Sequence, residues 1–209
     1  MIKVLLADDH ALLRGSLKQL LEDTGYIQVV AQAGDYSEII AAIAKHPVDV
    51  AILDISMPGK NGVDVVKILK DKKPDIKILM LSMHPEDQYA VRSLKAGASG
   101  YLTKNTAPEK LVDAIQVIAA GRKYITPELA ESLASHLTED TDKPLHSSLS
   151  DREFETIRMI ASGKKLSEIA SDMALSPKTV SVYRARILEK MRMKTNGELT
   201  KYALENGLI

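Results

Sequence analysis

The sequence predicts an α/β domain with a parallel sheet, followed by a smaller all-α domain. In the first part, short apolar runs alternate with helix-like segments five times within about 120 residues, which is typical of βαβ units with helices on both faces of a parallel sheet. Beyond about residue 145 no strand-like run remains, and four segments have helical periodicity. The 209 residues allow two small domains, and 45% are hydrophobic, enough for a real core.

The elements of the first part follow from apolar runs and helix-ending residues. Gly25 and Pro47 end helices, and Pro108 opens the last helix as a first-turn proline. The third strand is apolar throughout and is followed by the turn Pro58-Gly59, as expected for a strand buried on both faces. We expect strands at residues 2–7, 27–31, 48–53, 76–81 and 99–102, with helices at about 12–21, 37–45, 63–69, 86–96 and 108–120.

The second part is separated by a polar stretch. A further helix is expected at residues 127–137, and residues 138–144 are polar, acidic and end in proline, which is typical of an extended linker. Four helices are then expected at residues 151–162, 166–173, 177–193 and 196–206. We therefore predict domains at residues 1–122 and 147–209, with residues 123–146 as the connecting segment.

Composition narrows the class of protein. Positive and negative side chains balance at 28 each, but residues 146–209 have a net charge of +3 and the rest −3, the sign expected if the C-terminal part meets an anion. There is no cysteine, which excludes disulfides and thiol chemistry and fits a reducing compartment. The chain starts without a signal-peptide pattern, and its longest apolar run is far shorter than the ~20 residues of a membrane span. We expect a cytoplasmic protein with no membrane partner.

Reactive polar residues follow four of the five expected strands. Asp8 and Asp9 follow the first, Asp54 the third, Ser82 the fourth and Lys104 the fifth. Parallel strands bring their carboxyl ends to one edge, so these residues should converge. Three close carboxylates repel one another, and Mg²⁺ with a few carboxylates and waters relieves that repulsion. With a lysine and a hydroxyl beside it, Asp54 is suited to carry a phosphoryl group.

Each of these residues has a simpler interpretation when it is taken alone. An aspartate after a strand is most often a turn or helix-capping residue, which applies to Asp8, Asp9 and Asp54. Lys104 alone would be an ordinary surface lysine. Their combination at one sheet edge is what favours phosphoryl chemistry.

The C-terminal helices have the pattern of a helix-turn-helix. Ser150 and Glu153 form a capping box, and Ser176-Pro177 restarts a helix after a tight turn. Residues 178–194 have a net charge of +5. Small and basic side chains on the face away from the core allow close approach to base edges and phosphates, although charge alone favours an ordinary helix with a solvated basic face. The candidate DNA contacts are Lys178, Thr179, Ser181, Val182, Ala185 and Arg186.

At this point the first 120 residues resemble the receiver domain of bacterial response regulators, which has a flavodoxin-like doubly wound fold. The resemblance rests on Asp8-Asp9, Asp54 followed by Met57-Pro58 and Gly62, Ser82 and Lys104. It implies that Asp54 is phosphorylated, that Asp9, Asp54 and the Ser56 backbone carbonyl bind Mg²⁺, and that Asp8 assists through water. It also implies that Ser82 is a switch hydroxyl, with Lys104 as an ion-pair partner. Tyr101 matches the aromatic switch position or is simply a packed tyrosine.

Residues 147–209 resemble the LuxR-type helix-turn-helix domain. The matching runs are Leu149–Glu153, Leu175–Ser181 and Ile187–Met191. Together the two parts resemble the NarL/FixJ family, with the run from Ser176 to Arg184 most like its GacA/UvrY- and BvgA-like members. The resemblance implies a two-component response regulator, not an enzyme. A sensor histidine kinase would phosphorylate it, and it would bind double-stranded promoter DNA as a homodimer, with RNA polymerase as a further candidate partner.

Two other functions stay open on the residues alone. A phosphotransferase or phosphatase with an aspartyl nucleophile needs a second acid-base carboxylate two residues after Asp54, and Ser56 occupies that position. Alternatively, the C-terminal helices bind protein or RNA. Steep salt dependence of DNA binding separates this last alternative from a DNA-binding output.

Overall fold

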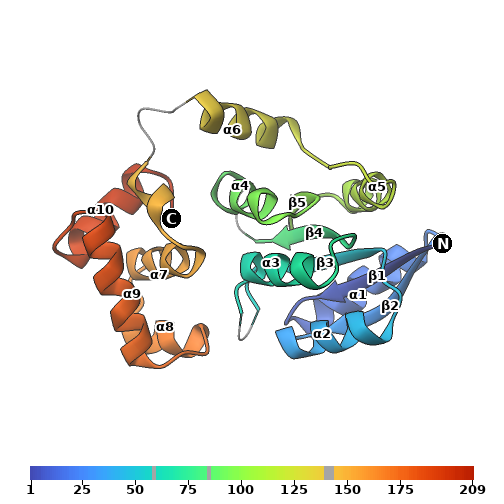
Figure 1. Cartoon of the computed structure of the whole chain (residues 1–209), viewed down its shortest axis with the longest axis horizontal. Coiled ribbons are helices and arrows are strands. Elements are labelled where there is room, and N and C mark those ends of the chain that lie inside the picture. Colours follow the sequence, from blue (N-terminus) through green and yellow to red (C-terminus); the bar gives the residue numbers. More distant parts are fainter. Residues whose placement is uncertain (58–59, 84–85, 139–143) are drawn as a thin grey trace. The chain divides into compact units, whose positions relative to one another are not determined.

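The computed structural model describes residues 1–57, 60–83, 86–138 and 144–209. These residues form two compact units, Met1–Ser135 and His136–Ile209, shown in Figure 1. The expected turn at Pro58-Gly59, His84 and most of the acidic linker stretch lie outside the described residues. None of the helices in the described ranges is long and apolar enough to cross a membrane.

The first unit is built on a five-stranded sheet in which every pair is parallel. Its strand order is β2-β1-β3-β4-β5, the flavodoxin-like order, so the predicted fold class is confirmed. The order reverses between β1 and β3, and in such sheets ligands bind beside the carboxyl ends of the strands at the reversal. The strands are β1 Ile2–Ala7, β2 Ile27–Ala33, β3 Val50–Asp54, β4 Lys77–Ser82 and β5 Gly100–Thr103.

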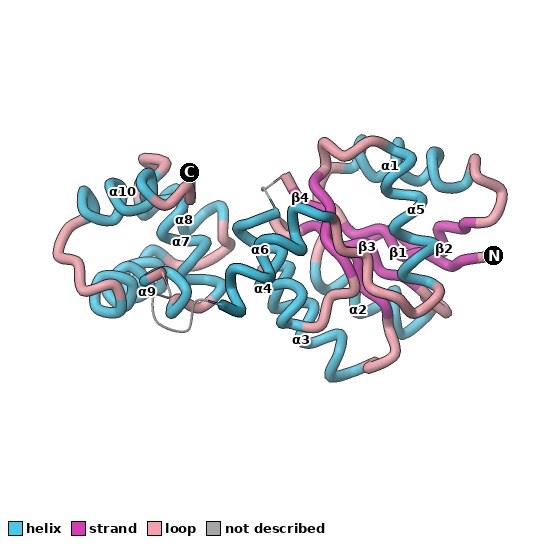
Figure 2. The backbone as a smooth tube through the Cα atoms, turned by 90° about the horizontal axis from the view of Figure 1, so that it is seen from above, coloured by secondary structure: helices cyan, strands magenta, loops and turns pink. Residues whose placement is uncertain are grey.

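Helices cover both faces of this sheet, as Figure 2 shows for α1 and α5 on one side and α2 and α3 on the other. Apolar residues of α1 and α5, such as Leu21 and Ile115, form one core cluster with Val4, Ile52 and Leu79 of the strands. All five residues of β3 are buried, which fits a central strand with helices on both faces. The helices are α1 Ala11–Glu22, α2 Tyr36–Lys45, α3 Gly62–Lys72, α4 Glu86–Ala96 and α5 Pro108–Ala119.

β3, β4 and β5 each end one residue later than expected, and the sheet extends further beyond the expected strands in two places. β2 continues to Ala33, where it pairs with Ala7, although its apolar run ends at Ala31. In the segment expected as a connector, Tyr124 forms a parallel bridge with Gly100, and its N–H donates to the Ser99 carbonyl at 2.9 Å. The helix expected after it is present as α6 Pro127–Thr138.

The second unit is all-helical. A 3₁₀ turn at Leu145–Ser148 leads into four helices, and the turn between the second and third places Ala174 at a positive φ of 53°. Val180 of the third helix packs with Ile160, Ile169 and Met173 in one apolar cluster. The short second helix and the longer third helix form the expected helix-turn-helix. The helices are α7 Asp151–Ala161, α8 Leu166–Asp172, α9 Pro177–Lys190 and α10 Asn196–Glu205.

Glu153 links the start of α7 to the end of α9. Its side chain is buried, accepts a hydrogen bond from the Ser150 N–H at 2.8 Å, and pairs with Lys190 Nζ at 2.6 Å. Burial acts to raise the pKa of Glu153, but the hydrogen bonds from Lys190 and Ser150 outweigh it and lower the pKa. The ionised carboxylate therefore stabilises the fold, fully above its ordinary pKa of about 4.5 and less as the pH falls through the lower folded-state pKa.

We expect Glu153→Gln to weaken the second unit by about 2 kcal/mol at neutral pH, because charged hydrogen bonds are lost. Hydrogen exchange of the α7 backbone amides in the whole chain measures this. The difference from wild type should shrink as the pH falls below about 4.5, where the wild-type carboxylate takes up a proton. Glu189→Gln, at an exposed position on α9, is the control. A difference that stays constant down to acidic pH contradicts the assigned role of the charge.

Candidate functional site

Asp8, Asp54 and Lys104 meet at the carboxyl edge of the sheet. β1 ends immediately before Asp8, β3 ends at Asp54, and β5 ends immediately before Lys104. Lys104 Nζ lies 2.5 Å from Asp8 Oδ2 and 2.8 Å from Asp54 Oδ2, and the exposed fractions of the three side chains are only 3 to 6%. The convergence expected from the parallel sheet is therefore present. Asp8 also accepts a turn hydrogen bond from the His10 N–H at 2.8 Å, but both aspartates pair with Lys104 as well, and Lys104 is buried and not a solvated surface lysine.

Burial is the largest single influence on the pKa values of Asp54 and Lys104. It raises the pKa of Asp54, and the negative charge of Asp8 raises it further, while Lys104 and a hydrogen bond from the Ser56 backbone oppose these effects. For Lys104, burial acts to lower the pKa, but the carboxylates of Asp54 and Asp8 outweigh it and raise the pKa. One ammonium group thus serves two buried carboxylates. A further cation at this edge would stabilise both carboxylates in the ionised form.

Asp9 and His10 complete the edge on its solvent side. The side chain of Asp9 is about a third exposed, and His10 Nδ1 lies 2.7 Å from its Oδ1. Four residues each place one side-chain oxygen or nitrogen atom here, and these four atoms all lie within 4.8 Å of one another. The residues are Asp8, Asp9, His10 and Asp54. The three aspartates were predicted from the sequence, whereas His10 was not. The only signal for it in the sequence was its position directly after the acidic pair.

The other expected site residues lie on β4 and β5 or shortly after β3. Ser82 is the last residue of β4 and is fully buried, and its carbonyl accepts from the Lys104 N–H at 2.7 Å. Tyr101 is fully buried in β5 and pairs in register with Met80. Ser56 follows β3 and is exposed. The backbones of Ser82 and Lys104 are therefore hydrogen-bonded to each other, and the Tyr101 side chain is buried on the strand β5.

Gly62 allows the loop after Asp54 to pack tightly. An added Cβ at Gly62 would lie 2.6 Å from the Asp54 carbonyl oxygen and 2.7 Å from Ile55 Cα, distances that real Cβ atoms do not adopt. The Gly62 N–H also donates to the Ile55 carbonyl at 2.9 Å. The start of α3 is thereby held against the end of β3, which positions the Asp54 side chain.

The third helix of the second unit presents a basic, open face. Val180 and Ile187 of α9 are buried, whereas Val182 is 42% exposed. The N–H of Thr179 donates to Ser176 Oγ at 3.1 Å, so the helix begins with the expected cap. The Thr179 hydroxyl is also 2.8 Å from Ser176 Oγ, which gives it a structural role. The exposed residues among the expected contacts are Lys178, Ser181, Val182, Ala185 and Arg186.

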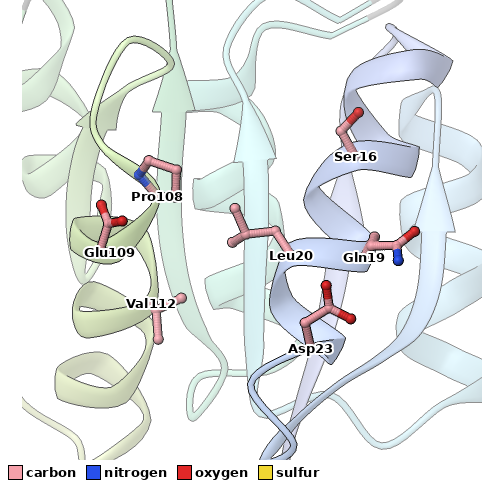
Figure 3. Close-up of a pocket in the computed structure, with 7 residues that line it drawn as sticks. All are labelled: Ser16, Gln19, Leu20, Asp23, Pro108, Glu109 and Val112. Carbon is pink, nitrogen blue, oxygen red and sulfur yellow. The ribbon is translucent and has the colours of Figure 1, made fainter.

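A groove of about 620 Å³ lies between α1 and α5 (Figure 3). Leu20 and Val112 form its apolar floor, and Asp23 and Glu109 add carboxylates at its rim. A smaller cavity of about 130 Å³ also borders Leu20 and extends to Lys104. Most of the residues that line this smaller cavity are apolar, and Lys104 is the one charged residue among the described residues that line it.

Comparison with known proteins defines the class that this fold and site belong to. Residues 4–116 match the family model of the response regulator receiver domain, and residues 147–203 match that of bacterial regulatory proteins of the luxR family. The chain therefore belongs to the response regulators that join a receiver domain to a LuxR-type DNA-binding domain.

The chain is similar to its relatives over nearly their whole length. The chain is 37% identical to Response regulator UvrY of Escherichia coli K12, covering 100% of this chain and 96% of the relative. It is 38% identical to Response regulator GacA of Pseudomonas aeruginosa PAO1, covering 100% of this chain and 98% of that one. Both relatives are response regulators, and UvrY and GacA are the members that the sequence most resembled, so the resemblance to the NarL/FixJ family is confirmed.

Solved structures give the same result. RcsB from Salmonella enterica serovar Typhimurium, bound to a promoter in the presence of the phosphomimetic BeF₃⁻, aligns with a TM-score of 0.69 and 26% identity. The alignment covers 96% of this chain and 97% of RcsB.

Proposed function

We propose that Asp54 accepts a phosphoryl group from a sensor histidine kinase. The observation that carries the proposal is a buried carboxylate at the end of β3, paired with Lys104 and adjacent to Asp8. A carboxylate oxygen of Asp54 attacks the phosphorus of a phosphohistidine. The O–P bond forms, the N–P bond breaks, and the kinase imidazole leaves with the electron pair. Lys104 stabilises the negative charge on the phosphoryl oxygens.

The donor atoms at the edge fit Mg²⁺. Asp9, Asp54 and the backbone carbonyl of Ser56 supply oxygen atoms of the kind that Mg²⁺ prefers and would hold the ion, and Asp8 would assist through a water molecule. The bound ion supplies charge neutralisation for the phosphoryl oxygens. The shortage of positive charge around the two buried carboxylates supports this assignment.

Phosphorylation then changes the partners of Ser82 and Lys104. The Ser82 hydroxyl donates to a phosphoryl oxygen, and Lys104 pairs with the phosphoryl group in place of the free carboxylate. Tyr101 on β5 responds to the movement of Ser82 on the adjacent strand β4. The phosphoryl group can alter the output only if the two conformations differ in affinity for DNA or for a second protomer.

The output is binding of promoter DNA as a homodimer in the cytoplasm. α9 enters the major groove with Ser181, Val182 and Ala185 against base edges, while Lys178 and Arg186 contact phosphates and Thr179 lies at the helix start. The structure of RcsB bound to a promoter supports the binding of promoter DNA. RNA polymerase is a further candidate partner at the promoter.

Acetyl phosphate with Mg²⁺ provides the test of the phosphorylation site. Wild-type protein should gain one phosphoryl group, detected by intact-mass spectrometry, and Asp54→Ala should gain none. Chelation of Mg²⁺ should reduce labelling of the wild type. Asp49→Ala, which removes an exposed aspartate at the other end of β3, is the matched control. Equal labelling of wild type and Asp54→Ala would refute the assignment.

A further inference from the structure

His10 directs an imidazole at the acidic edge. It is the N-cap residue of α1, but its side chain makes no capping hydrogen bond. Instead, its Nδ1 lies 2.7 Å from Asp9 Oδ1 and 3.2 Å from Asp8 Oδ1. The backbone N–H of His10 also donates to Asp8 Oδ1 at 2.8 Å, which fixes the orientation of that carboxylate. The ring is 70% exposed, so it borders both the carboxylates and solvent.

The positions of the donor atoms suit a single small cation. Donors from Asp8, Asp9, His10 and Asp54 all lie within 4.8 Å of one another. Opposite ligands of a six-coordinate ion with bonds of about 2.1 Å are about 4.2 Å apart. The set therefore needs only a small contraction to close around an ion.

Lys104 and His10 approach Asp8 from different sides. Lys104 contacts Oδ2 of Asp8, whereas His10 contacts Oδ1. Lys104 is buried and His10 is largely exposed. An ion can therefore use the imidazole on the solvent side without replacing the ammonium group inside.

The chemistry of an imidazole discriminates between metal ions. Mg²⁺ is a hard cation that prefers oxygen ligands, so an additional nitrogen donor adds little to its binding. Imidazole suits Ni²⁺, Co²⁺ and Zn²⁺, which also bind mixed nitrogen and oxygen sites more tightly than the earlier divalent ions do. A histidine beside three carboxylates thus shifts the preference of the site from Mg²⁺ toward transition-metal ions.

We propose that His10 is an additional metal ligand, which makes this edge bind first-row transition ions such as Ni²⁺ more tightly than Mg²⁺. The inference rests on the proposed function, because both use the carboxylates of Asp8, Asp9 and Asp54. His10 acts as a specificity-determining residue for the metal. Transition ions at sufficient concentration therefore displace Mg²⁺ from this edge.

Calorimetric titration of the whole chain, without a histidine tag, with NiCl₂ and separately with MgCl₂ tests this inference. The Kd for Ni²⁺ should be at least about tenfold lower than that for Mg²⁺ in the wild type. His10→Ala should raise the Kd for Ni²⁺ by about tenfold or more and change that for Mg²⁺ by less than about threefold. Alanine is used because an asparagine amide would itself supply an oxygen ligand. The visible spectrum of bound Co²⁺ should also change in His10→Ala, since a nitrogen ligand is lost.

Two other histidines serve as controls. His46→Ala, at the end of α2, should leave both affinities unchanged, and His84→Ala tests the histidine that follows β4 in the sequence. Loss of Ni²⁺ affinity in His84→Ala but not in His10→Ala would overturn the inference, as would equal Ni²⁺ and Mg²⁺ affinities in the wild type. These titrations measure metal binding in the absence of any phosphoryl donor. Their outcome is therefore independent of the labelling experiment with acetyl phosphate, in which failure to label the wild type would refute the proposed function.

Discussion

Replacing Val182 by glutamate should abolish specific DNA binding. Val182 lies on the exposed face of α9 between Lys178 and Arg186, and 42% of it is exposed. A carboxylate there meets phosphates and base acceptors and loses its water, so we expect a loss of about 3 kcal/mol or more, roughly 100-fold in Kd. Glutamate is a better helix former than valine, so α9 itself should be preserved.

Fluorescence anisotropy on a promoter fragment recovered by genomic footprinting with the wild type measures this loss. Leu204→Glu is the matched control, because Leu204 is an exposed apolar residue on α10 and receives the same change. We expect its Kd to stay within about threefold of wild type. Affinity that survives Val182→Glu, or that falls equally in both variants, would exclude α9 as the reading helix. The wild-type Kd should also rise steeply with salt, because phosphate contacts release counterions.

Removing the charge of Lys104 should destabilise the receiver domain strongly when no Mg²⁺ is present. Lys104→Met retains most of the aliphatic stem but leaves Asp8 and Asp54 buried together without their ammonium partner. Breaking a buried pair in this way typically costs about 3–5 kcal/mol, and the repulsion between the two carboxylates adds to it. Addition of Mg²⁺ should restore more stability to this variant than to the wild type, because the ion takes over the neutralisation.

Hydrogen exchange of the β1 and β3 amides in the whole chain, with chelator and with Mg²⁺, provides the measurement. Lys67→Met is the control: its exposed pair with Asp64, at 3.7 Å, is worth less than about 1 kcal/mol. Similar losses in the two variants, or a Mg²⁺ effect no larger than in the wild type, would show that Lys104 does not neutralise the cluster.

The parallel sheet explains why the acidic edge could be predicted. Once β1, β3 and β5 are read as parallel strands, Asp8, Asp54 and Lys104 must share one edge whatever the loops between them do. The end of β2 could not be predicted from the pattern of apolar residues. Gln32 and Ala33 belong to the sheet because they pair with Leu6 and Ala7, and backbone pairing leaves no hydrophobic signal. The bridge from Tyr124 to Gly100 was missed for the same reason.

The amino-acid sequence by itself determined the two fold classes, the order of the elements and the convergence of Asp8, Asp54 and Lys104 at one edge of the sheet. Local periodicity and strand-end residues carry that information. Only the tertiary structure decided which groups neutralise each other: Lys104 lies between two buried carboxylates, and His10 turns toward Asp9 instead of capping α1. Such pairings depend on burial and on side-chain direction across different strands, which spacing along the chain does not encode.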